Sequence, residues 1–547
     1  MRKNTFAKID GGAVFQAPLF VYCDYIAGRF YAVDGERKFR GDSFEVLFRE
    51  LGRIREARLQ HFRNHEPQIL VIVNDLNVFS VLVKDFLGDA QSVGSKSSFG
   101  SVHTLELRTA GFLFRNFNFI ANARPEQLCS FFDVNNPAQA MVLFFDKLAG
   151  DRKHYRLRWS LASITKKDFY HDFREELWEE MKKEEIFFHS FQHYVDMFAG
   201  NKAGALLRFD DESRGFRKII EGVRSFDKKS AYPSVFVSDD VFPLSRPVRV
   251  MKDKAAALRN ALACRHWFKI VIRTKEKLPE LVPFRDADDP ELYGIEYYDF
   301  LLMKNVLEIH PSRLAQIMNR SEWRLYTVKH TGRLCKVFRD EIIRAFILKN
   351  AISDKNNFER FTLKTQLDML FGKALQKKNF TNVKQVNKYY TGRGENYLLP
   401  QHSMHAIAAV RYEVMRAVKL IGPAAIAYDT DAIKTIGGAD IFEVLNDELR
   451  MKNSEAGYPE SEIGLWMHEW TAQRFLQICT KSYMYDDGEI HTKHAGISDS
   501  DFQRYTKTVR GDLMQHFTQK RELDALGKYV YIKPEQKFIR IVNKFTL

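Results

Sequence analysis

The carboxylates best placed to do chemistry in this sequence are Asp227 and the pair Asp429 and Asp431. Asp227 follows the strand expected at 223–226, and the pair flanks one residue within the apolar segment 424–438. Carboxylates so close together repel one another unless a cation lies between them, and Mg²⁺ prefers oxygen ligands. The pattern favours a divalent-cation site. Taken alone, a strand end before a turn or a solvated acidic β-turn also explains these residues.

Residues of two further segments have side chains suited to a phosphorylated ligand. Ser230 and Tyr232 follow Asp227 in a turn whose backbone and side chains could cradle a triphosphate and a sugar. Lys364, Asp368 and Phe371 are spaced by four and three, which places them on one face of a helix. A lysine there can neutralise phosphate while the ring lines a base or sugar. An amphipathic helix with a solvated lysine is the alternative explanation.

The overall charge points to a polyanionic partner. The 547 residues include 84 Lys and Arg against 70 Asp and Glu, a net charge of +14. This excess favours nucleic acid, although a basic soluble protein of another kind stays open. The five cysteines lie far apart without a CxxC pair, which argues against disulfides and zinc and for a reducing compartment. With no signal-like N-terminus and no apolar run of about 18 residues, we expect a cytoplasmic protein without a membrane partner.

The elements that must position these residues belong to two parts of the chain. In the first part we expect α/β structure, with strands around a glycine turn at 18–34, a helix at 43–64, a strand at 69–74, a hairpin at 103–121 and helical structure at 166–200. The first domain boundary is expected near Gly200.

The second part begins with the strand at 223–226, and mixed strands are expected to about residue 300. The later elements expected are two helices within 338–372 broken near 353–357, an exposed loop or hairpin at 373–400, an amphipathic helix at 403–421 and a hairpin around Asp429. Ser403 is the expected N-cap of the amphipathic helix, and Gly422 its stop.

In this order the segments resemble the motifs of the family B DNA polymerases, specifically their protein-primed bacteriophage branch. The D-x-x-S-x-Y-P motif of that family matches Asp227 to Pro233, and its D-T-D turn matches Asp429 to Asp431. Its K-x-x-x-N-x-x-Y-G helix matches Lys364 to Gly372, with Asp368 in place of Asn and Phe371 in place of Tyr.

Further segments add to the resemblance. The K-x-Y segment of the family matches Lys481 and Tyr483, and its K-x-A-G segment begins at Lys493. Its glycine-containing link before the first motif matches Arg214, Gly215 and Phe216. The resemblance covers most of the chain beyond residue 210. The two substitutions in the helix motif put nucleotide affinity and selectivity in doubt.

The resemblance implies an α/β multidomain fold, with an RNase H-like exonuclease-type domain before a right-hand polymerase of palm, fingers and thumb. The implied domains are an inactive exonuclease-like domain at 1–195, palm at 196–300, an insertion resembling the first terminal-protein region at 280–335, fingers at 336–372, a short insertion resembling the second terminal-protein region at 373–400, palm at 401–490 and thumb at 491–547.

The resemblance also implies roles for individual residues. Two Mg²⁺ ions, with Mn²⁺ as an alternative, would be held by Asp227, Asp429 and the backbone carbonyl of Lys228, and Asp431 would complete the catalytic set. The implied nucleotide-binding residues are Ser230, Tyr232, Lys349, Lys364, Asp368 and Phe371. The implied primer- and DNA-binding residues are Arg214, Gly215, Thr430, Lys481, Tyr483 and Lys493. Tyr232 would lie under the sugar and exclude a 2′-hydroxyl.

The acids of the family's exonuclease site are mostly missing. Asp24 matches the first acid of the D-x-E motif, but Ile26 replaces the glutamate. The second motif ends in Ser80, although Asp75 lies nearby, and the third has Phe187, Phe188 and Ser190 where an aspartate is expected. One carboxylate cannot hold two hard cations, so we expect no proofreading.

The function implied is a DNA-directed DNA polymerase (a nucleotidyltransferase) acting as a monomer. Its partners would be template-primer DNA, deoxynucleoside triphosphates and a terminal protein as primer, in the host cytoplasm if the source is viral. Two alternatives stay open: a catalytically silent nucleic-acid-binding scaffold with the polymerase fold, and a primer-independent primase-polymerase.

Overall fold

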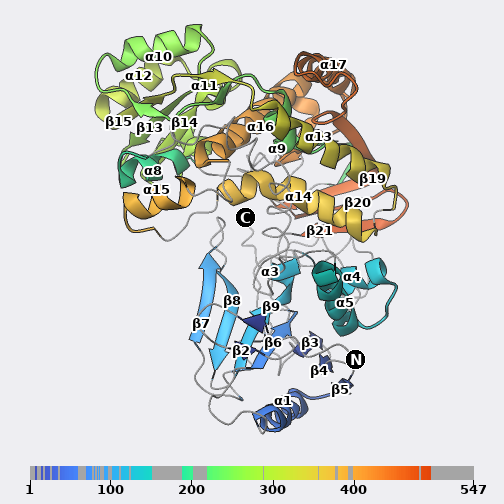
Figure 1. The fold of residues 1–547 in the computed structure, drawn as a ribbon. Helices are drawn as coiled ribbons and strands as arrows, with labels where there is room; N and C mark the ends of the chain where they lie inside the picture. The colour runs from blue at the N-terminus through green and yellow to red at the C-terminus, as the bar shows by residue number, and fades with distance from the viewer. Residues whose placement is uncertain are drawn as a thin grey trace. The chain divides into compact units, whose positions relative to one another are not determined.

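The computed structural model of the chain describes residues 7–8, 14–15, 19–24, 28–34, 37–59, 69–74, 76, 79, 83, 86, 91–96, 102–109, 112–121, 123, 125–150, 188–200, 219–276, 278–286, 289–354, 356–375, 380–391, 398–479 and 482–494. They divide into two compact units (Figure 1). The first takes its described residues from Met1–Asp168 and Lys349–Thr365, and the second from Phe169–Leu348 and Gln366–Tyr529. No helix among the described residues is long and apolar enough to cross a membrane.

The first unit is built on a seven-stranded sheet in the order β5-β4-β3-β6-β9-β8-β7. Only the pairs β3–β6 and β6–β9 are parallel. The strands are β3 (Leu19–Asp24), β4 (Arg29–Asp34), β5 (Arg37–Gly41), β6 (Ile69–Val73), β7 (Gln91–Lys96), β8 (Val102–Thr109) and β9 (Phe112–Asn116), with a separate ladder of β1 (Ala7–Lys8) and β2 (Val14–Phe15).

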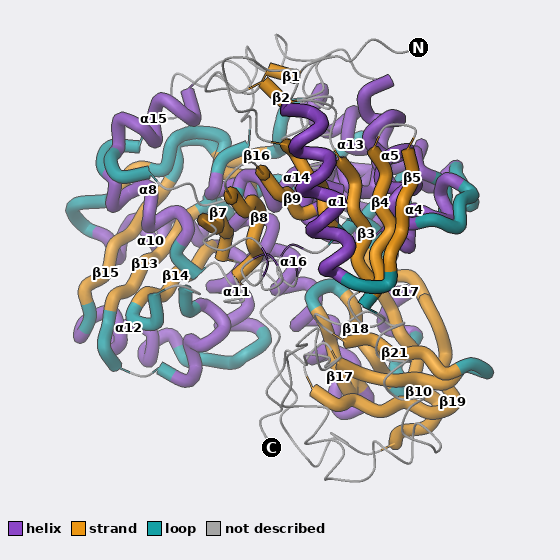
Figure 2. The backbone as a smooth tube through the Cα atoms, turned by 90° about the horizontal axis from the view of Figure 1, so that it is seen from below, coloured by secondary structure: helices purple, strands orange, loops and turns teal. Residues whose placement is uncertain are grey.

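Helices cover both faces of this sheet. They are α1 (Phe44–Leu59), α3 (Phe117–Ala121), α4 (Pro125–Phe132) and α5 (Pro137–Gly150). Alternate residues of a strand point to opposite faces. Leu19 and Val21 therefore pack in one core with Leu47 of α1, while Phe20 packs in the other with Phe144 of α5. In Figure 2, α1 runs beside β3, β4 and β5.

The second unit contains two larger antiparallel sheets. The six-stranded sheet has the order β17-β18-β10-β19-β20-β21, and the four-stranded sheet has the order β12-β15-β13-β14. The strands are β10 (Ile219–Lys228), β11 (Phe242–Pro243), β12 (Val248–Arg249), β13 (Phe268–Arg273), β14 (Leu292–Glu296), β15 (Glu322–Thr327), β16 (Thr331–Gly332), β17 (Ala425–Asp429), β18 (Ala432–Thr435), β19 (Trp466–Cys479), β20 (Ser482–Asp486) and β21 (Ile490–His494). Figure 2 shows β18, β10 and β19 side by side.

The long helix α16 (Pro400–Ile421) is central to the second unit, where it contacts α8, α9, α11 and α17. The others are α8 (Phe191–Phe198), α9 (Ala231–Ser238), α10 (Lys254–Ala263), η3 (Pro279–Phe284), α11 (Tyr297–Asn305), α12 (Pro311–Arg320), α15 (Val383–Thr391), η4 (Gly422–Ala424) and α17 (Asp440–Glu455). Two more helices, α13 (Lys336–Ala351) and α14 (Phe358–Ala374), contain residues of both units.

Buried charges join α16 to its neighbours. The His405 ring lies between two carboxylates, with Nε2 3.0 Å from Asp239 Oδ1 and Nδ1 bonded to Glu296. Burial lowers the pKa of His405, but Glu296 and Asp239 outweigh this and raise it to about 10. The ring is therefore charged at neutral pH. One turn and a half later, Arg411 donates to Asp299 of α11 over 2.8 Å.

Most expected elements are confirmed. The strands around Gly28, helix α1, strands β6 and β10, the two helices broken at 352–357 and the hairpin of β17 and β18 are all present. Gly28 has φ +67° and Gly422 has φ +64°, conformations that favour glycine at such turns. The segment 103–121 forms a strand pair as expected, but its last five residues are helix α3. Most of 166–200 lies outside the described residues. The part that is described, 188–200, contains helix α8.

Two expectations were wrong. The segment 373–400 contains helix α15, because Val386 and Tyr390 lie one turn apart and are both buried. Ser403 is not an N-cap but lies buried inside α16. That helix begins earlier, at Pro400, since the fixed φ of proline suits a first helical turn.

Candidate active site

The six-stranded sheet brings Asp227 and Asp429 to one edge. Asp227 is the last residue but one of β10, and Asp429 is the last of β17. Strand β18 lies between these two strands, and both aspartates pair with the same residue, Ala432. Paired residues of antiparallel strands point to the same face, so the two carboxylates share a face with their Cα atoms about 10 Å apart.

A strained turn fixes Asp431 beside them. Thr430 has φ +57°, a conformation that disfavours most side chains, and its hydroxyl donates to Asp429 Oδ1 over 2.9 Å. The Asp431 N–H donates to the Asp429 carbonyl over 2.7 Å. The Lys228 N–H donates to the Asp431 carbonyl over 3.1 Å, so the hairpin turn is bonded directly to the strand that carries Asp227.

The three carboxylates leave an excess of negative charge. Burial, and then the charge of Asp429, raise the pKa of Asp431 to about 6. Asp368 of α14 adds to the shift, which shows that its carboxylate also acts on this turn. The pKa of the Tyr232 hydroxyl is raised too, by burial and then by Asp431. A bound cation would offset the repulsion between these carboxylates.

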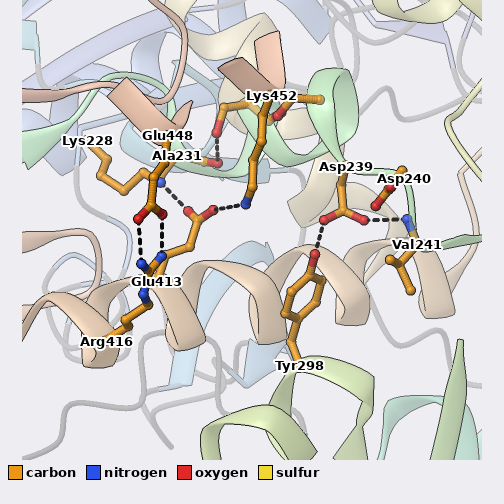
Figure 3. A network of polar contacts seen from close by, with 12 residues as sticks. Lys228, Ala231, Asp239, Asp240, Val241, Tyr298, Glu413, Arg416, Glu448 and Lys452 are labelled. Carbon is orange, nitrogen blue, oxygen red and sulfur yellow. Dashed lines mark hydrogen bonds and ion pairs between the residues drawn. The ribbon is translucent and has the colours of Figure 1, made fainter. Parts of the chain in front are cut away.

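Lys228 anchors the strand end from the other face of the sheet. Its side chain is fully buried and its ammonium group bonds to Glu413 of α16 (Figure 3). Glu413 Oε1 also lies 3.6 Å from Lys452 Nζ of α17. Neighbouring Phe226 stacks on Phe442 of α17 with ring centroids 4.0 Å apart. The strand that carries Asp227 is therefore held by both charge and apolar packing.

Sequence reasoning missed a buried lysine in the site, Lys434. This residue pairs with Ser225, two positions from Asp227, and is 3% exposed. Its Nζ lies 4.9 Å from the ring centroid of Tyr483. Ser225 Oγ donates to Glu469 Oε2 over 3.0 Å. The signal that could have found Lys434 is the period of two along a strand, which puts it on the face of Asp227 and Asp429.

The predicted nucleotide-binding residues lie on three helices, α9, α13 and α14, or directly before one of them. Ser230 has φ +51° and precedes the first turn of α9, which includes the half-buried Tyr232. Lys364 and Asp368 are exposed on α14, and Phe371 is three residues further along. Lys349 belongs with Lys364 to the first unit, so the contribution of these two lysines stays a prediction.

The predicted primer-binding residues are described in part. Tyr483 of β20 and Lys493 of β21 are cross-strand partners. Burial raises the pKa of Tyr483, as do the charges of Glu469 and Asp429. Arg214, Gly215 and Lys481 lie outside the described residues.

Of the predicted exonuclease positions, three are described. Asp24 ends β3, and its carboxylate lies 4.0 Å from Arg29. Ser190 is the N-cap of α8 and accepts from the His193 N–H over 3.1 Å, while Phe188 is buried. The remaining positions, Ile26, Asp75, Ser80 and Phe187, lie outside the described residues.

At the end of β6, next to β3 in the first unit's sheet, Asn74 takes a structural role. Its side-chain oxygen accepts from the Cys23 N–H over 2.9 Å, and its amide donates to the Cys23 carbonyl over 3.0 Å. Both ends of the Asn74 amide are thus bonded to the strand that ends in Asp24.

The donor set of the aspartate site fits hard cations shared with a substrate. Within the described part of the chain, no group of three or more His, Cys, Asp and Glu is arranged to hold a metal. Mg²⁺ is usually bound by one or two carboxylates with phosphate oxygens and water supplying the rest. Asp227, Asp429 and Asp431 match that pattern in chemistry, and burial together with the charge of Asp429 raises the pKa of Asp431.

Comparison with known proteins identifies the fold. No protein-family model matches the sequence, and no curated protein does. Phi29 DNA polymerase complexed with primer-template DNA matches with a TM-score of 0.56 and 14% identity, over 92% of this chain and 92% of that one. Its ternary complex with primer-template DNA and incoming nucleotides gives 0.52 and 14%, over 89% and 93%. Its complex with single-stranded DNA gives 0.54 and 14%, over 92% of each chain.

The match extends over nearly the whole chain in spite of the low identity, so the resemblance seen in the motifs holds for the architecture as well. The chain has the fold of phi29 DNA polymerase.

Proposed function

We propose that this protein is a template-directed DNA polymerase that adds deoxynucleotides to a primer 3′ hydroxyl by a two-metal mechanism. The observation that carries the proposal is the convergence of Asp227 and Asp429 on Ala432, with Asp431 bonded into the same turn, in a chain with this fold. Carboxylates that converge on one sheet face can share a pair of catalytic cations.

The residues of the site would act by holding and orienting the reactants. Asp227, Asp429 and the Lys228 carbonyl would hold two Mg²⁺ ions, with Asp431 beside them. Bound Mg²⁺ activates the primer hydroxyl and neutralises charge on the triphosphate. Template sequence would be read by base pairing, since protein contacts to the DNA backbone position the duplex without specifying bases.

The residues around the carboxylates would bind the nucleotide and the primer. Tyr232 would lie under the sugar and disfavour ribonucleotides. Burial and then the charge of Asp431 raise the pKa of its hydroxyl. Lys364 would bind the triphosphate, with Lys349 as a second contact. Tyr483 and Lys493, paired across β20 and β21, would contact the primer.

We further propose protein priming and the absence of proofreading. Segments 280–335 and 373–400 correspond to the terminal-protein regions of the protein-primed branch, and a terminal protein would offer a Ser, Thr or Tyr hydroxyl as primer. The palm would comprise 196–300 and 401–490, the fingers 336–372 and the thumb 491–547. Proofreading would be absent because Asp24 is the one acid that matches the exonuclease motifs, and its neighbours Asn74 and Arg29 serve structural contacts.

A second candidate, a silent DNA-binding scaffold, is favoured by one observation. Lys434 is a buried lysine on the sheet face of Asp227 and Asp429, the carboxylates that would hold the metals. In an inactive relative of a metal enzyme, such a lysine could replace the metal altogether.

Primer extension separates the two candidates. The full chain is incubated with a labelled primer-template, the four deoxynucleotides and Mg²⁺ or Mn²⁺. We expect extension by the wild type, its loss in Asp429→Asn and Asp227→Asn, and normal extension by Glu460→Gln, which changes an exposed acid on the loop after α17. Absence of extension with either metal would favour the scaffold. A labelled single strand incubated with the same protein should stay intact, and metal-dependent shortening would refute the loss of proofreading.

A further inference from the structure

Lys434 is unusual because it brings an ammonium group into a carboxylate site through a buried strand. It lies in β18 between the strands that carry Asp227 and Asp429, and its side chain is on their face of the sheet. All four residues of β18 are buried. An ammonium group removed from water needs charged or hydrogen-bonding partners, since an isolated buried charge is strongly unfavourable.

Asp227 and Asp429, the acids that would bind metal, are the diagonal neighbours of Lys434 on the two adjacent strands. Burial lowers the pKa of Lys434, and the charges of Asp429, Glu469 and Asp227 oppose that effect, with Asp429 the largest of the three. A cation stabilised in this way neutralises part of the charge on Asp429 and Asp227. Any divalent cation that binds there must approach an ammonium group of like charge.

An aromatic contact helps to hold the lysine at this position. The Tyr483 ring lies 4.9 Å from Nζ, within the range of a cation–π interaction. The charge of Glu469, which accepts from Ser225 and is not a candidate metal ligand, also opposes the effect of burial on the pKa of Lys434. Lys434 therefore links the carboxylate edge to Tyr483, the predicted primer contact.

We propose that Lys434 is a resident positive charge of the carboxylate site, which offsets the repulsion between the aspartates without metal and competes with divalent cations for them. The inference rests on the proposed function, because it takes Asp227 and Asp429 as metal ligands. It makes Lys434 a positioning residue that sets how much metal the site needs. The wild type would bind metal weakly and exchangeably. Its metal affinity would increase once the competing charge is removed.

Direct metal binding tests the inference without relying on activity. Mn²⁺ is titrated into the metal-free full chain and followed by calorimetry for the wild type, Lys434→Met and Lys434→Gln. We expect both variants to bind Mn²⁺ tighter by about tenfold, since one unit of like charge on the same sheet face is removed. The control is Lys304→Gln, which removes the same charge from an exposed position on α11 and should leave the affinity unchanged.

The results distinguish failure of the inference from failure of the proposed function. If the wild type binds Mn²⁺ and the Lys434 variants bind it equally or more weakly, Lys434 is not a competitor, although the site is still a metal site. If neither the wild type nor the variants bind Mn²⁺, the proposed two-metal function fails as well. Binding by Lys434→Met alone would support the competition in its strongest form.

A second measurement covers the case in which the variants are less stable. The rise in melting temperature on adding Mn²⁺ reports binding to the folded protein, whatever the starting stability. We expect a larger rise for Lys434→Met than for the wild type, and a wild-type rise for Lys434→Arg, which keeps the charge. Equal rises in Lys434→Met and the wild type would overturn the inference.

Discussion

Replacing Glu413 by Gln should strongly destabilise the second unit, because Glu413 is the carboxylate partner of a fully buried lysine. Lys228 has no solvent-exposed side-chain surface, and its ammonium group bonds to Glu413. Lys452, the other cation near Glu413, keeps 45% of its side chain exposed and can be hydrated instead (Figure 3). Glu413→Gln therefore leaves one buried ammonium group facing a neutral amide.

The expected cost follows from the difference between Lys228 and Lys452. Removing one partner of a buried ion pair typically costs about 3–5 kcal/mol, whereas an exposed pair contributes about 0–1 kcal/mol. Lys228→Met should cost less than Glu413→Gln, roughly 1–2 kcal/mol, because Glu413 still has Lys452 within 3.6 Å. The double variant with Lys228→Met and Glu413→Gln removes both charges and should be less destabilised than the sum of the two single variants.

Urea unfolding of the full-length protein measures these differences, with the shift in midpoint at constant slope giving the change in free energy of unfolding. Glu448→Gln is the matched control, since Glu448 pairs with Arg416 at half-exposed positions and its loss should cost under about 1 kcal/mol. The reasoning is refuted if Glu413→Gln is no more destabilising than Glu448→Gln, or if the double variant costs the full sum. Because the Lys228 N–H bonds to Asp431, Glu413→Gln should also slow primer extension at temperatures where the protein stays folded.

Three further predictions concern the pH dependence of the site and the packing of its framework. Because the pKa of Asp431 is raised to about 6 in the folded protein, the metal-free stability should fall by roughly 2–3 kcal/mol as pH rises from about 4 to 7; Asp431→Asn should abolish this fall, and an unchanged slope in urea titrations would contradict it. His405, with a pKa of about 10, should contribute fully to the stability of the fold below pH 6.5, and this contribution should be lost as pH rises through 10. His405→Leu should lower the free energy of unfolding by about 3–5 kcal/mol at pH 7, because Glu296 stays buried without its cation, and a large drop in melting temperature would confirm this. Gly294→Ala should destabilise the second unit severely, because the added Cβ would lie 2.0 Å from the Ala199 carbonyl oxygen; a melting temperature within a few degrees of wild type would show that the backbone gives way.

Local sequence signals predicted the elements whose boundaries depend on the chain itself. The turn at Gly28, the stop at Gly422 and the hairpin ended by Asp429 each follow from a residue with a clear conformational preference. Helix α15 was missed because its burial comes from contacts with α8, which polar composition does not report. Ser403 misled because a good capping residue is also compatible with a buried helix interior.

For the site, the order of the motifs predicted the type of chemistry, while the pairing of strands decided which residues meet. Asp227 and Asp429 are far apart in sequence, and only β18 between their strands makes them neighbours. Lys434 and Glu469 were missed for the same reason, since neither belongs to a motif and both depend on strand pairing for their position. Spacing along the chain carries no information about cross-strand partners until the register is known.

The two buried lysines of the site act from opposite faces of one sheet, and this separates their roles. Lys228 points with Phe226 toward the helices and fixes the backbone that carries Asp227, so its loss should appear in stability and in the rate of extension. Lys434 points to the aspartate face and contributes charge, so its loss should appear in metal affinity. A variant of Lys228 or Glu413 that changed Mn²⁺ affinity as much as Lys434→Met would show that position and charge are coupled through the strand, and that the sheet does not insulate one face from the other.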